Sequence, residues 1–254
     1  MILTKENACF NIFHIPNLGD DHSKRFSCYI NLKEMLSQQY NNLNSPAIRI
    51  QNEEDYNLFK EKYYPLNING NLTHGEIGLW ASNLIAFDNF LKSEYDYLIL
   101  FEDDAELNFR FFDVFDKHTA ALPDNFDLFA LFVRGEEHVR FTDVDNNNEV
   151  VPLYQWWDTG GVLYSRSGVE KILRAVGSNG IDCPIDLFFY DCNLGSDKDN
   201  YGPAEPKASD NSRVIKKYNF ISYGLHPKAD WLMGKLPLKS NIWELPRINF
   251  SEKE

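Results

Sequence analysis

The sequence has few cysteines, no long apolar run and fewer basic than acidic residues. Its four cysteines, Cys9, Cys28, Cys183 and Cys192, include no Cys-x-x-Cys pair, which argues against a zinc knuckle or a redox motif and favours reduced thiols. No stretch approaches the roughly 18 uninterrupted apolar residues of a membrane span, and the opening residues MILTKENACF lack a charged region followed by an apolar one. We therefore expect a cytoplasmic protein that has no membrane span and begins near Met1.

The shortage of basic residues limits the partners of the chain. The 254 residues include 25 Lys and Arg against 38 Asp and Glu, which gives a formal net charge of −13. This balance argues against a general affinity for nucleic acid or anionic membranes, while a local basic site for one phosphorylated ligand is compatible with it. With 43% hydrophobic and 15% aromatic residues, the chain can bury the core of a single domain that spans residues 1–254.

Apolar runs and helical periodicity alternate along the chain and predict an α/β fold. Helices are expected after residue 26, at 52–63 and from 74 onwards. Buried strands are expected at 8–16, 95–101 and 126–132, and further strands at 46–50 and 159–165. The segment 133–157 has the turn residues of a hairpin-rich insertion, 183–192 is expected to hold a short helix begun by Pro184, and 198–213 to form a mobile loop. A helix that leads into a near-continuous apolar strand is typical of a mostly parallel central sheet with helices on both faces.

Two S/T-x-x-E patterns predict where helices begin. Thr73 with Glu76, and Ser167 with Glu170, each have the spacing of a capping box. Apolar residues recur at intervals of three and four after both patterns, which indicates one core-facing side of each helix.

The most informative short segment is YLILFEDDAEL, in which Glu102, Asp103 and Asp104 follow an apolar run. Adjacent carboxylates raise one another's pKa unless a positive group lies among them, and open α/β sheets bind ligands at the carboxyl ends of their strands. If the strand persists, Glu102 and Asp104 point to one side and can hold Mg²⁺ or Mn²⁺, while Asp103 points to the other. The alternative is that EDDAE opens a solvated loop or a helix N-terminus.

The segment HGEIGLWASNLIAFDNFLKSEYDYLILFEDDAEL resembles glycosyltransferase family 25, whose pattern is a GE-x-G-x-x-x-SH helix followed by an LEDD strand end. The matching residues are Gly75, Glu76, Gly78, Ser82 and the triplet 102–104. A second segment, WWDTGGVLYSRSGVEKILRAVGSNGIDCPID, is similar to the family's G-T-x-G-Y-x-I-S segment with a following helix and PVD element, and IFHIPNLGDDHSKRF is more loosely similar to its opening strand. The sequence departs from the pattern at His14, Pro16, Leu79, Asn83 and Gly160.

The resemblance implies a GT-A type, Rossmann-like fold, with a nucleotide-binding half at about 1–110, an acceptor-side half at 111–225 and a C-terminal tail at 226–254. It implies that a hexose, galactose or glucose, is moved with inversion from a UDP-sugar to a hydroxyl of a glycan acceptor, with Mn²⁺ or Mg²⁺ as cofactor. The family includes lipopolysaccharide sugar transferases and collagen galactosyltransferases. The resemblance implies that the following residues bind the nucleotide sugar: Pro16, Asn17, Arg25, Glu76, Ser82, Asn83, Glu102, Asp103, Gly160 and Gly161.

The resemblance also implies metal ligands and a general base. Asp104 is the first candidate for direct metal contact, Glu102 binds the ribose or the metal's water shell, and His226 is a candidate third ligand. Inversion needs a carboxylate that takes the proton of the acceptor hydroxyl. Asp186 is our first candidate, because an apolar setting raises the pKa of a carboxyl group, and Asp158 is the second.

Each of these candidates has a structural alternative. Asp186 is equally placed to be a helix N-cap or first-turn acid, Glu76 to complete the capping box, and Arg25 and His226 to lie on the polar surface. Trp156 and Trp157 are either a platform for a sugar ring or part of the core. Lys228 and Lys235, close to His226 in the chain, are candidates to neutralise diphosphate oxygens.

Two other functions use the same features. A Mg²⁺-dependent phosphohydrolase or nuclease also needs clustered carboxylates, but no second acidic pair with a nucleophile is found, and the net charge disfavours a polynucleotide substrate. A catalytically silent nucleotide-sugar or glycan-binding module has mild support from Asn83 and Gly160. Binding of UDP with and without manganese separates these functions from a metal-dependent transferase.

Overall fold

The computed structural model describes residues 1–16, 21–62, 67–132, 140–141, 149–155, 158–190, 218–226, 229, 232–235 and 247–249. Asn17, Trp156, Trp157, Lys228 and the predicted loop 198–213 lie outside this range. In the described part, no helix has the length and apolar character needed to cross a membrane. Cys9, Cys28 and Cys183 are free thiols, as predicted.

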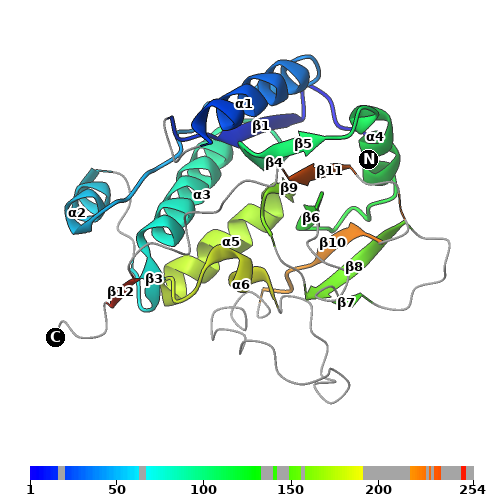
Figure 1. Ribbon diagram of the computed structural model, residues 1–254. Helices are drawn as coiled ribbons and strands as arrows, with labels where there is room; N and C mark the ends of the chain where they lie inside the picture. The colour runs from blue at the N-terminus through cyan, green and yellow to red at the C-terminus, as the bar shows by residue number, and fades with distance from the viewer. Residues whose placement is uncertain are drawn as a thin grey trace.

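An eight-stranded sheet with the order β2-β1-β4-β9-β6-β10-β8-β7 forms the centre of the fold (Figure 1). Its strands are β1 (Ala8–Phe13), β2 (Asn41–Asn42), β4 (Tyr97–Glu102), β6 (Leu128–Ala130), β7 (Arg140–Phe141), β8 (Val150–Gln155), β9 (Gly161–Ser165) and β10 (Ser222–Leu225). Only β9 and β8 run against the common direction of these strands. The described sheet is therefore mostly parallel in strand direction, as predicted.

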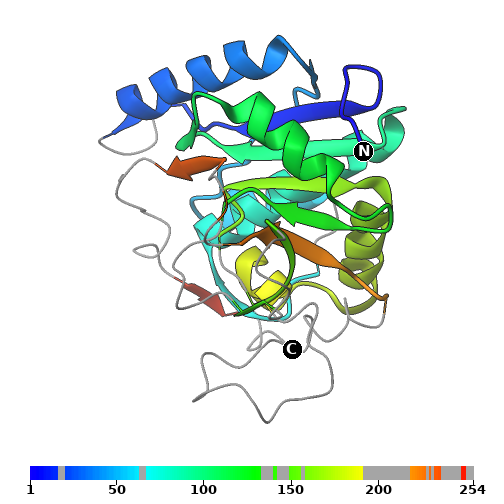
Figure 2. The same cartoon turned by 90° about the vertical axis from the view of Figure 1, so that its right-hand side faces the viewer.

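Helices cover both faces of this sheet. The helices are α1 (His22–Ser37), α2 (Glu53–Lys62), α3 (His74–Lys92), α4 (Phe111–Ala120), α5 (Arg166–Asn179) and α6 (Ile185–Tyr190). Leu98 and Leu100 of β4 pack in one core with α3, α5 and α6, whereas Ile99 and Phe101 pack in a second core with α1 and α4. Figure 2 shows α4 in front of the stacked strands. Because both faces of β4 are buried, its sequence is apolar without alternation.

Two small strand pairs join distant parts of the chain. β5 (Ala105–Leu107) pairs antiparallel with β11 (Met233–Lys235), and β3 (Asn71–Thr73) pairs antiparallel with β12 (Arg247–Asn249). In Figure 1, β11 lies beside β5, close to the end of β4. The last part of the chain therefore returns to the acidic segment.

Two local predictions were wrong. Residues 46–50 form no strand, because this segment runs along α3: the Ile48 amide donates to Ser82 Oγ, and the Ile48 carbonyl would lie 2.7 Å from a Cβ at Gly78. The N-cap of α5 is Ser165 rather than Ser167, and its Oγ accepts from the Gly168 amide at 3.1 Å. The capping box of Thr73 and Glu76 is confirmed, with bonds of 2.7 and 3.2 Å.

Candidate functional site

Three adjacent strands bring their ends together at one edge of the sheet. Phe13 at the end of β1 pairs with Glu102 at the end of β4. Phe101 pairs with Gly161, the first residue of β9, and the Glu102 amide donates to the Gly160 carbonyl at 3.0 Å. The residues that follow β1 and β4 and those that precede β9 therefore share one edge, where α/β sheets place their ligands.

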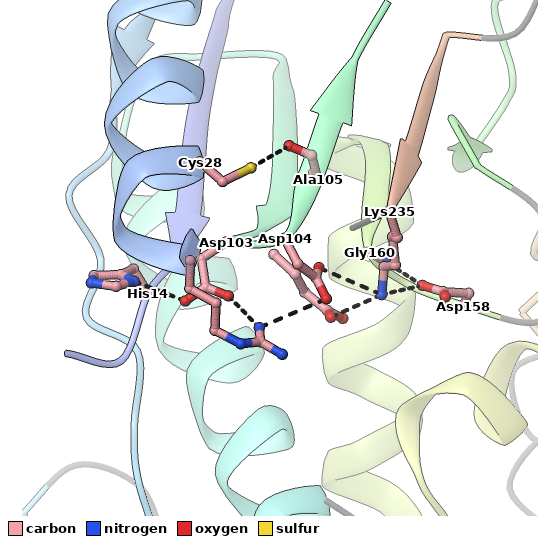
Figure 3. Close-up of polar contacts among 10 residues, drawn as sticks. His14, Cys28, Asp103, Asp104, Ala105, Asp158, Gly160 and Lys235 are labelled. Carbon is pink, nitrogen blue, oxygen red and sulfur yellow. Dashed lines mark hydrogen bonds and ion pairs between the residues drawn. The ribbon is translucent and has the colours of Figure 1, made fainter. Parts of the chain in front are cut away.

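The acidic triplet does not continue the strand, which corrects the assumption behind its predicted alternation. β4 ends at Glu102, and Asp103 and Asp104 form a turn before β5. Glu102 and Asp104 nevertheless both approach Lys235, while Asp103 contacts Arg25 and His14. Figure 3 shows Asp104 directed to Lys235 and Asp103 directed to His14. The predicted division of the triplet holds, but the turn produces it rather than the two-residue period of a strand.

Lys235 lies where three carboxylates converge. Its Nζ is 2.7 Å from Asp158 Oδ1, 3.0 Å from Glu102 Oε2 and 3.9 Å from Asp104 Oδ1. The strand pairing fixes this position, since Lys235 of β11 is paired with Ala105, the residue after Asp104. An ammonium group therefore supplies the positive charge that the triplet needs.

Asp103 is the centre of a second group of contacts, on the side of α1. Its Oδ1 accepts from Arg25 at 2.6 Å, and its Oδ2 is 2.8 Å from His14 Nδ1. The His14 ring stacks on Tyr29 with 4.6 Å between the ring centroids. Cys28 Sγ donates to the Ala105 carbonyl and holds α1 beside the triplet. Arg25 also lies 3.7 Å from Asp104 Oδ2, so the two groups are contiguous.

Asp158 occupies a strained backbone position. Its φ of +83° lies in the left-handed region, which a residue other than glycine rarely adopts. Its Oδ1 accepts from the Gly160 amide at 2.8 Å, a local bond of the kind that stabilises an Asp in a turn. Such strain is common at functional sites, where the surrounding contacts maintain it.

Asp186 continues the acidic group beyond Asp158. It lies in the first turn of α6 and accepts a hydrogen bond from Thr159 Oγ1 at 3.1 Å. Burial, together with the nearby Asp158 and Glu76 carboxylates, raises the pKa of Asp186 to about 6, against the lowering effect of Lys235 and the Thr159 hydrogen bond. The structure thus brings Asp186, Asp158 and the triplet into one electrostatically connected group.

The pKa values of Glu102 and Asp104 are also raised. Burial raises the pKa of Glu102 and of Asp104, and the neighbouring Asp158 raises both further, while Lys235 lowers them. Asp104 is 8% exposed, and its Oδ1 accepts no hydrogen bond from the described residues. A buried carboxylate oxygen without a hydrogen-bond donor is costly, so this oxygen has the capacity to accept a further polar or charged partner.

Three predicted binding residues lie on α3, and their described bonds are structural. Glu76 Oε2 accepts from the Thr73 amide and also lies close enough to Asp186 to raise its pKa. Ser82 Oγ links the Ile48 amide to the Gly78 carbonyl, and Asn83 Nδ2 donates to the Leu79 carbonyl. Of the three, Glu76 is the one that these contacts place beside the acidic group.

The remaining predicted residues lie at the edge of the group or away from it. Pro16 is exposed, two residues after His14. His226 follows β10, which is three strands from β4 in the sheet order, a lateral separation of about 14 Å at roughly 4.8 Å per strand. Its amide donates to the Glu149 carbonyl. His226 therefore follows a strand that is three positions away from β4 in the sheet.

Sequence reasoning missed two contributors, His14 and Thr159. Both lie next to strands at the edge that carries the triplet: His14 directly follows β1, and Thr159 is two residues before β9. The rule that ligands bind at the carboxyl ends of strands was sufficient to propose His14. Thr159 required knowledge that β9 runs antiparallel to β4.

The residues at this edge have the chemistry of a site for a hard divalent cation. Four carboxylates, Glu102, Asp103, Asp104 and Asp158, face two cations, Arg25 and Lys235, so the formal charge of the group is −2. Among the residues described, no three Asp, Glu, His or Cys side chains are arranged to hold a metal ion. Asp104 Oδ1, which accepts no described hydrogen bond, and the all-oxygen donor set have the chemistry that Mg²⁺ or Mn²⁺ prefers.

Comparisons with solved structures give distant likenesses. A mutant of Drosophila beta-1,4-galactosyltransferase 7, in complex with manganese, UDP-Gal and xylobiose, is 9% identical with a TM-score of 0.45, over 97% of this chain and 77% of that one. A glycosyltransferase involved in glycosylation of the major capsid of PBCV-1 is 11% identical with a TM-score of 0.36, over 88% and 94% of the two chains. No curated protein matches the sequence.

The comparison with protein-family profiles identifies the family of this chain. Residues 22–173 match the profile of glycosyltransferase family 25 (LPS biosynthesis protein). The matched range is more than half of the chain and contains Arg25, the triplet and the loop from Asp158 to Gly161. The predicted fold class, an α/β fold with a mostly parallel central sheet and helices on both faces, is confirmed by the structure. The chain belongs to glycosyltransferase family 25.

Proposed function

We propose that the chain transfers a hexose, galactose or glucose, from a UDP-sugar to a hydroxyl group of a glycan acceptor with inversion, assisted by Mn²⁺ or Mg²⁺. The family supports the reaction class. The observation that carries the finer proposal is the convergence of Glu102, Asp104 and Asp158 at the ligand edge of the sheet, with Asp186 beside them.

The acidic residues divide into two roles under this proposal. Asp104 and Glu102 would hold the cation. Asp104 has a buried oxygen without a hydrogen-bond donor, and Glu102 accepts from the Lys235 ammonium group, which Asp104 also approaches. When bound, the cation supplies electrostatic stabilisation to the departing diphosphate. On the α1 side, Arg25 is the residue that supplies positive charge to the nucleotide.

Asp186 is the general base in this proposal. Its carboxylate accepts the proton of the acceptor hydroxyl as the hydroxyl oxygen forms a bond to the anomeric carbon. The bond from that carbon to the diphosphate oxygen breaks, UDP leaves with the bonding electrons, and no covalent bond to the enzyme forms. Its pKa of about 6 suits a base that is ionised near neutral pH. Asp158 is less suited, because Lys235 and the Gly160 amide already occupy its Oδ1.

Calorimetric titration with UDP tests the proposal. We expect wild-type protein to bind UDP more tightly in Mn²⁺ than in EDTA, by roughly tenfold or more, because metal ligands and substrate phosphates usually share the cation. Asp104→Ala is expected to abolish this difference. Asp88→Ala removes a carboxylate from an exposed ion pair with Lys92 and serves as the control.

The donor is identified by measuring UDP release from a panel of UDP-hexoses. UDP affinity that is the same in Mn²⁺ and EDTA, and unaffected by Asp104→Ala, would refute the metal-dependent mechanism. Release from none of the UDP-hexoses in the presence of glycan acceptors would refute the proposed donor class.

A further inference from the structure

Lys235 places an ammonium group among three carboxylates. Its Nζ lies 2.7 Å from Asp158, 3.0 Å from Glu102 and 3.9 Å from Asp104. The side chain is 19% exposed, and its Nζ contacts Asp158 and Glu102 at hydrogen-bonding distance. In the conformation described, the ammonium group therefore occupies the space between the oxygens that would bind a metal.

The backbone around Lys235 is shaped to admit its side chain. A Cβ at Gly160 would lie 1.9 Å from Lys235 Cε and 2.5 Å from Nζ, so a side chain there would force the end of Lys235 to move. The next residue, Gly161, gives the same room to Met233, whose Sδ would lie 2.1 Å from a Cβ there. Figure 3 shows Lys235 passing Gly160 to reach Asp158. Two consecutive glycines thus accommodate β11 and fix the ammonium position.

One ammonium group does not balance these carboxylates. Glu102, Asp104 and Asp158 carry three negative charges against one, and Asp104 Oδ1 lies 3.9 Å from Nζ, beyond a hydrogen bond. An additional charge of +2 would bring the group to neutrality. However, a divalent cation that uses the same oxygens cannot keep the ammonium group in place, because the two positive centres repel each other at short range.

We propose that Lys235 is a resident counter-ion that competes with the divalent metal for Glu102, Asp104 and Asp158, and that it becomes a ligand of the diphosphate once the metal displaces it. This inference rests on the proposed function, from which it takes the metal and the UDP moiety. Lys235 thereby makes metal binding depend on the nucleotide: the diphosphate offers the displaced ammonium group a new anionic partner. Metal and nucleotide are then coupled through one side chain.

Titration with Mn²⁺ alone and with UDP, followed by the electron paramagnetic resonance signal of the free ion, tests this role. Without UDP, Lys235→Met is expected to bind Mn²⁺ roughly tenfold or more tightly than the wild-type protein, because the competing charge is gone. UDP is expected to strengthen Mn²⁺ binding less in this variant than in wild type. Lys117→Met, which removes an ammonium group from an exposed pair with Glu149, should behave like wild type in both titrations.

Thermal unfolding supplies a second measurement. Without metal, Lys235→Met leaves three uncompensated carboxylates, so its Tm in EDTA should fall below that of wild type, and Mn²⁺ should raise its Tm more than it raises that of wild type. If this variant does not fold in EDTA, Gly160→Ala provides a second route. Its Cβ displaces the Lys235 side chain and also approaches Asp158 Oδ1 at 2.8 Å, and tighter Mn²⁺ binding is expected.

Two results would count against the inference, and they are distinct. Folded Lys235→Met that binds Mn²⁺ with wild-type or weaker affinity, and with the same strengthening by UDP, overturns the role of Lys235 and leaves the proposed function intact. Failure of wild type and Lys235→Met alike to bind Mn²⁺, with or without UDP, overturns both the inference and the metal-dependent function.

Discussion

At the scale of single residues, Asp158 and Asp186 show how neighbouring carboxylates acquire different roles. Asp158 Oδ1 contacts the Lys235 ammonium group at 2.7 Å and accepts a hydrogen bond from the Gly160 amide at 2.8 Å. Asp186 receives one described hydrogen bond, from the Thr159 hydroxyl, and its pKa is raised by burial. The carboxylate with fewer fixed partners is the one free to accept a proton, which assigns the base to Asp186 under the proposed function.

Asp186→Asn should remove the base and preserve its shape. We expect kcat to fall by roughly 10²- to 10⁴-fold, the usual contribution of general base catalysis, with UDP binding in Mn²⁺ unchanged. In the wild-type protein, protonation of Asp186 should make kcat fall as the pH drops below about 6. A pH series of UDP release checks both points, and an Asn variant that retains wild-type kcat would exclude Asp186 as the base.

The free energy of unfolding of Asp186→Asn provides a control, because the direction of its change with pH can be predicted. The pKa of Asp186 rises from the usual 3.8 to about 6 on folding, so the folded protein loses stability as the pH rises from about 4 to 6, and this loss is constant above 6. Asp186→Asn should therefore match wild type near pH 3.5 and be more stable at pH 8, by at most about 3 kcal/mol. Urea unfolding at the two pH values measures the difference.

At the scale of elements, the start of α5 shows that a capping sequence pattern does not always form the cap. Ser167 and Glu170 have the spacing of a capping box, but the chain becomes helical at Arg166, whose guanidinium donates to the carbonyls of Leu91, Ser93 and Tyr95. This tertiary anchor fixes the helix start, and Ser165 becomes the cap. Ser167 instead donates to Asp127, a carboxylate that also binds Lys171 and the Ile221 amide.

Serine-to-alanine variants at the two positions distinguish these roles. Ser165→Ala should lower the free energy of unfolding by about 1 kcal/mol, because the Gly168 amide loses its acceptor. Ser167→Ala should change it by less than about 0.5 kcal/mol, since Asp127 keeps its other partners. Denaturant unfolding of both variants is the measurement, and a larger loss at Ser167 would contradict the assigned cap.

The sequence correctly predicted the elements whose buried residues are neighbours in the chain. The apolar run 97–101 predicted β4, and the triplet after it predicted the ligand edge, because a buried strand followed by carboxylates is a local pattern. Residues 46–50 have a similar apolar composition, but their backbone bonds to Ser82 of α3. The choice between a strand and an extended segment along a helix depends on a partner that short-range periodicity does not specify.

At the scale of the whole molecule, the site depends on contacts between residues far apart in the chain. Lys235 is 133 residues from Glu102, and a strand of three residues, β11, carries it there. Neither the length nor the periodicity of Met-Gly-Lys predicts a strand, so the sequence suggested a role for Lys235 at the diphosphate but not its contact with the carboxylates. The pair Gly160 and Gly161 is the sequence feature that corresponds to this contact, because each glycine leaves room for a side chain of β11.

Gly161 therefore determines how firmly the last part of the chain is attached to the sheet. In Gly161→Ala the new Cβ would lie 2.1 Å from Met233 Sδ and 3.4 Å from Phe101 Cδ1. Met233 is 2% exposed, so its side chain has little space into which to move, and we expect a loss of about 1 to 3 kcal/mol in the free energy of unfolding. The measurement is denaturant unfolding in EDTA.

Gly177→Ala in α5 is the matched control, because a Cβ there meets no atom within 4 Å. Alanine in a helix interior should raise the free energy of unfolding by about 0.5 to 1 kcal/mol, opposite in sign to the change at Gly161. Since displaced β11 also carries Lys235 away from the carboxylates, Gly161→Ala should bind Mn²⁺ more tightly than wild type, whereas Gly177→Ala should not. A destabilised Gly161→Ala with unchanged Mn²⁺ affinity would show that β11 supports the fold without controlling the metal ligands.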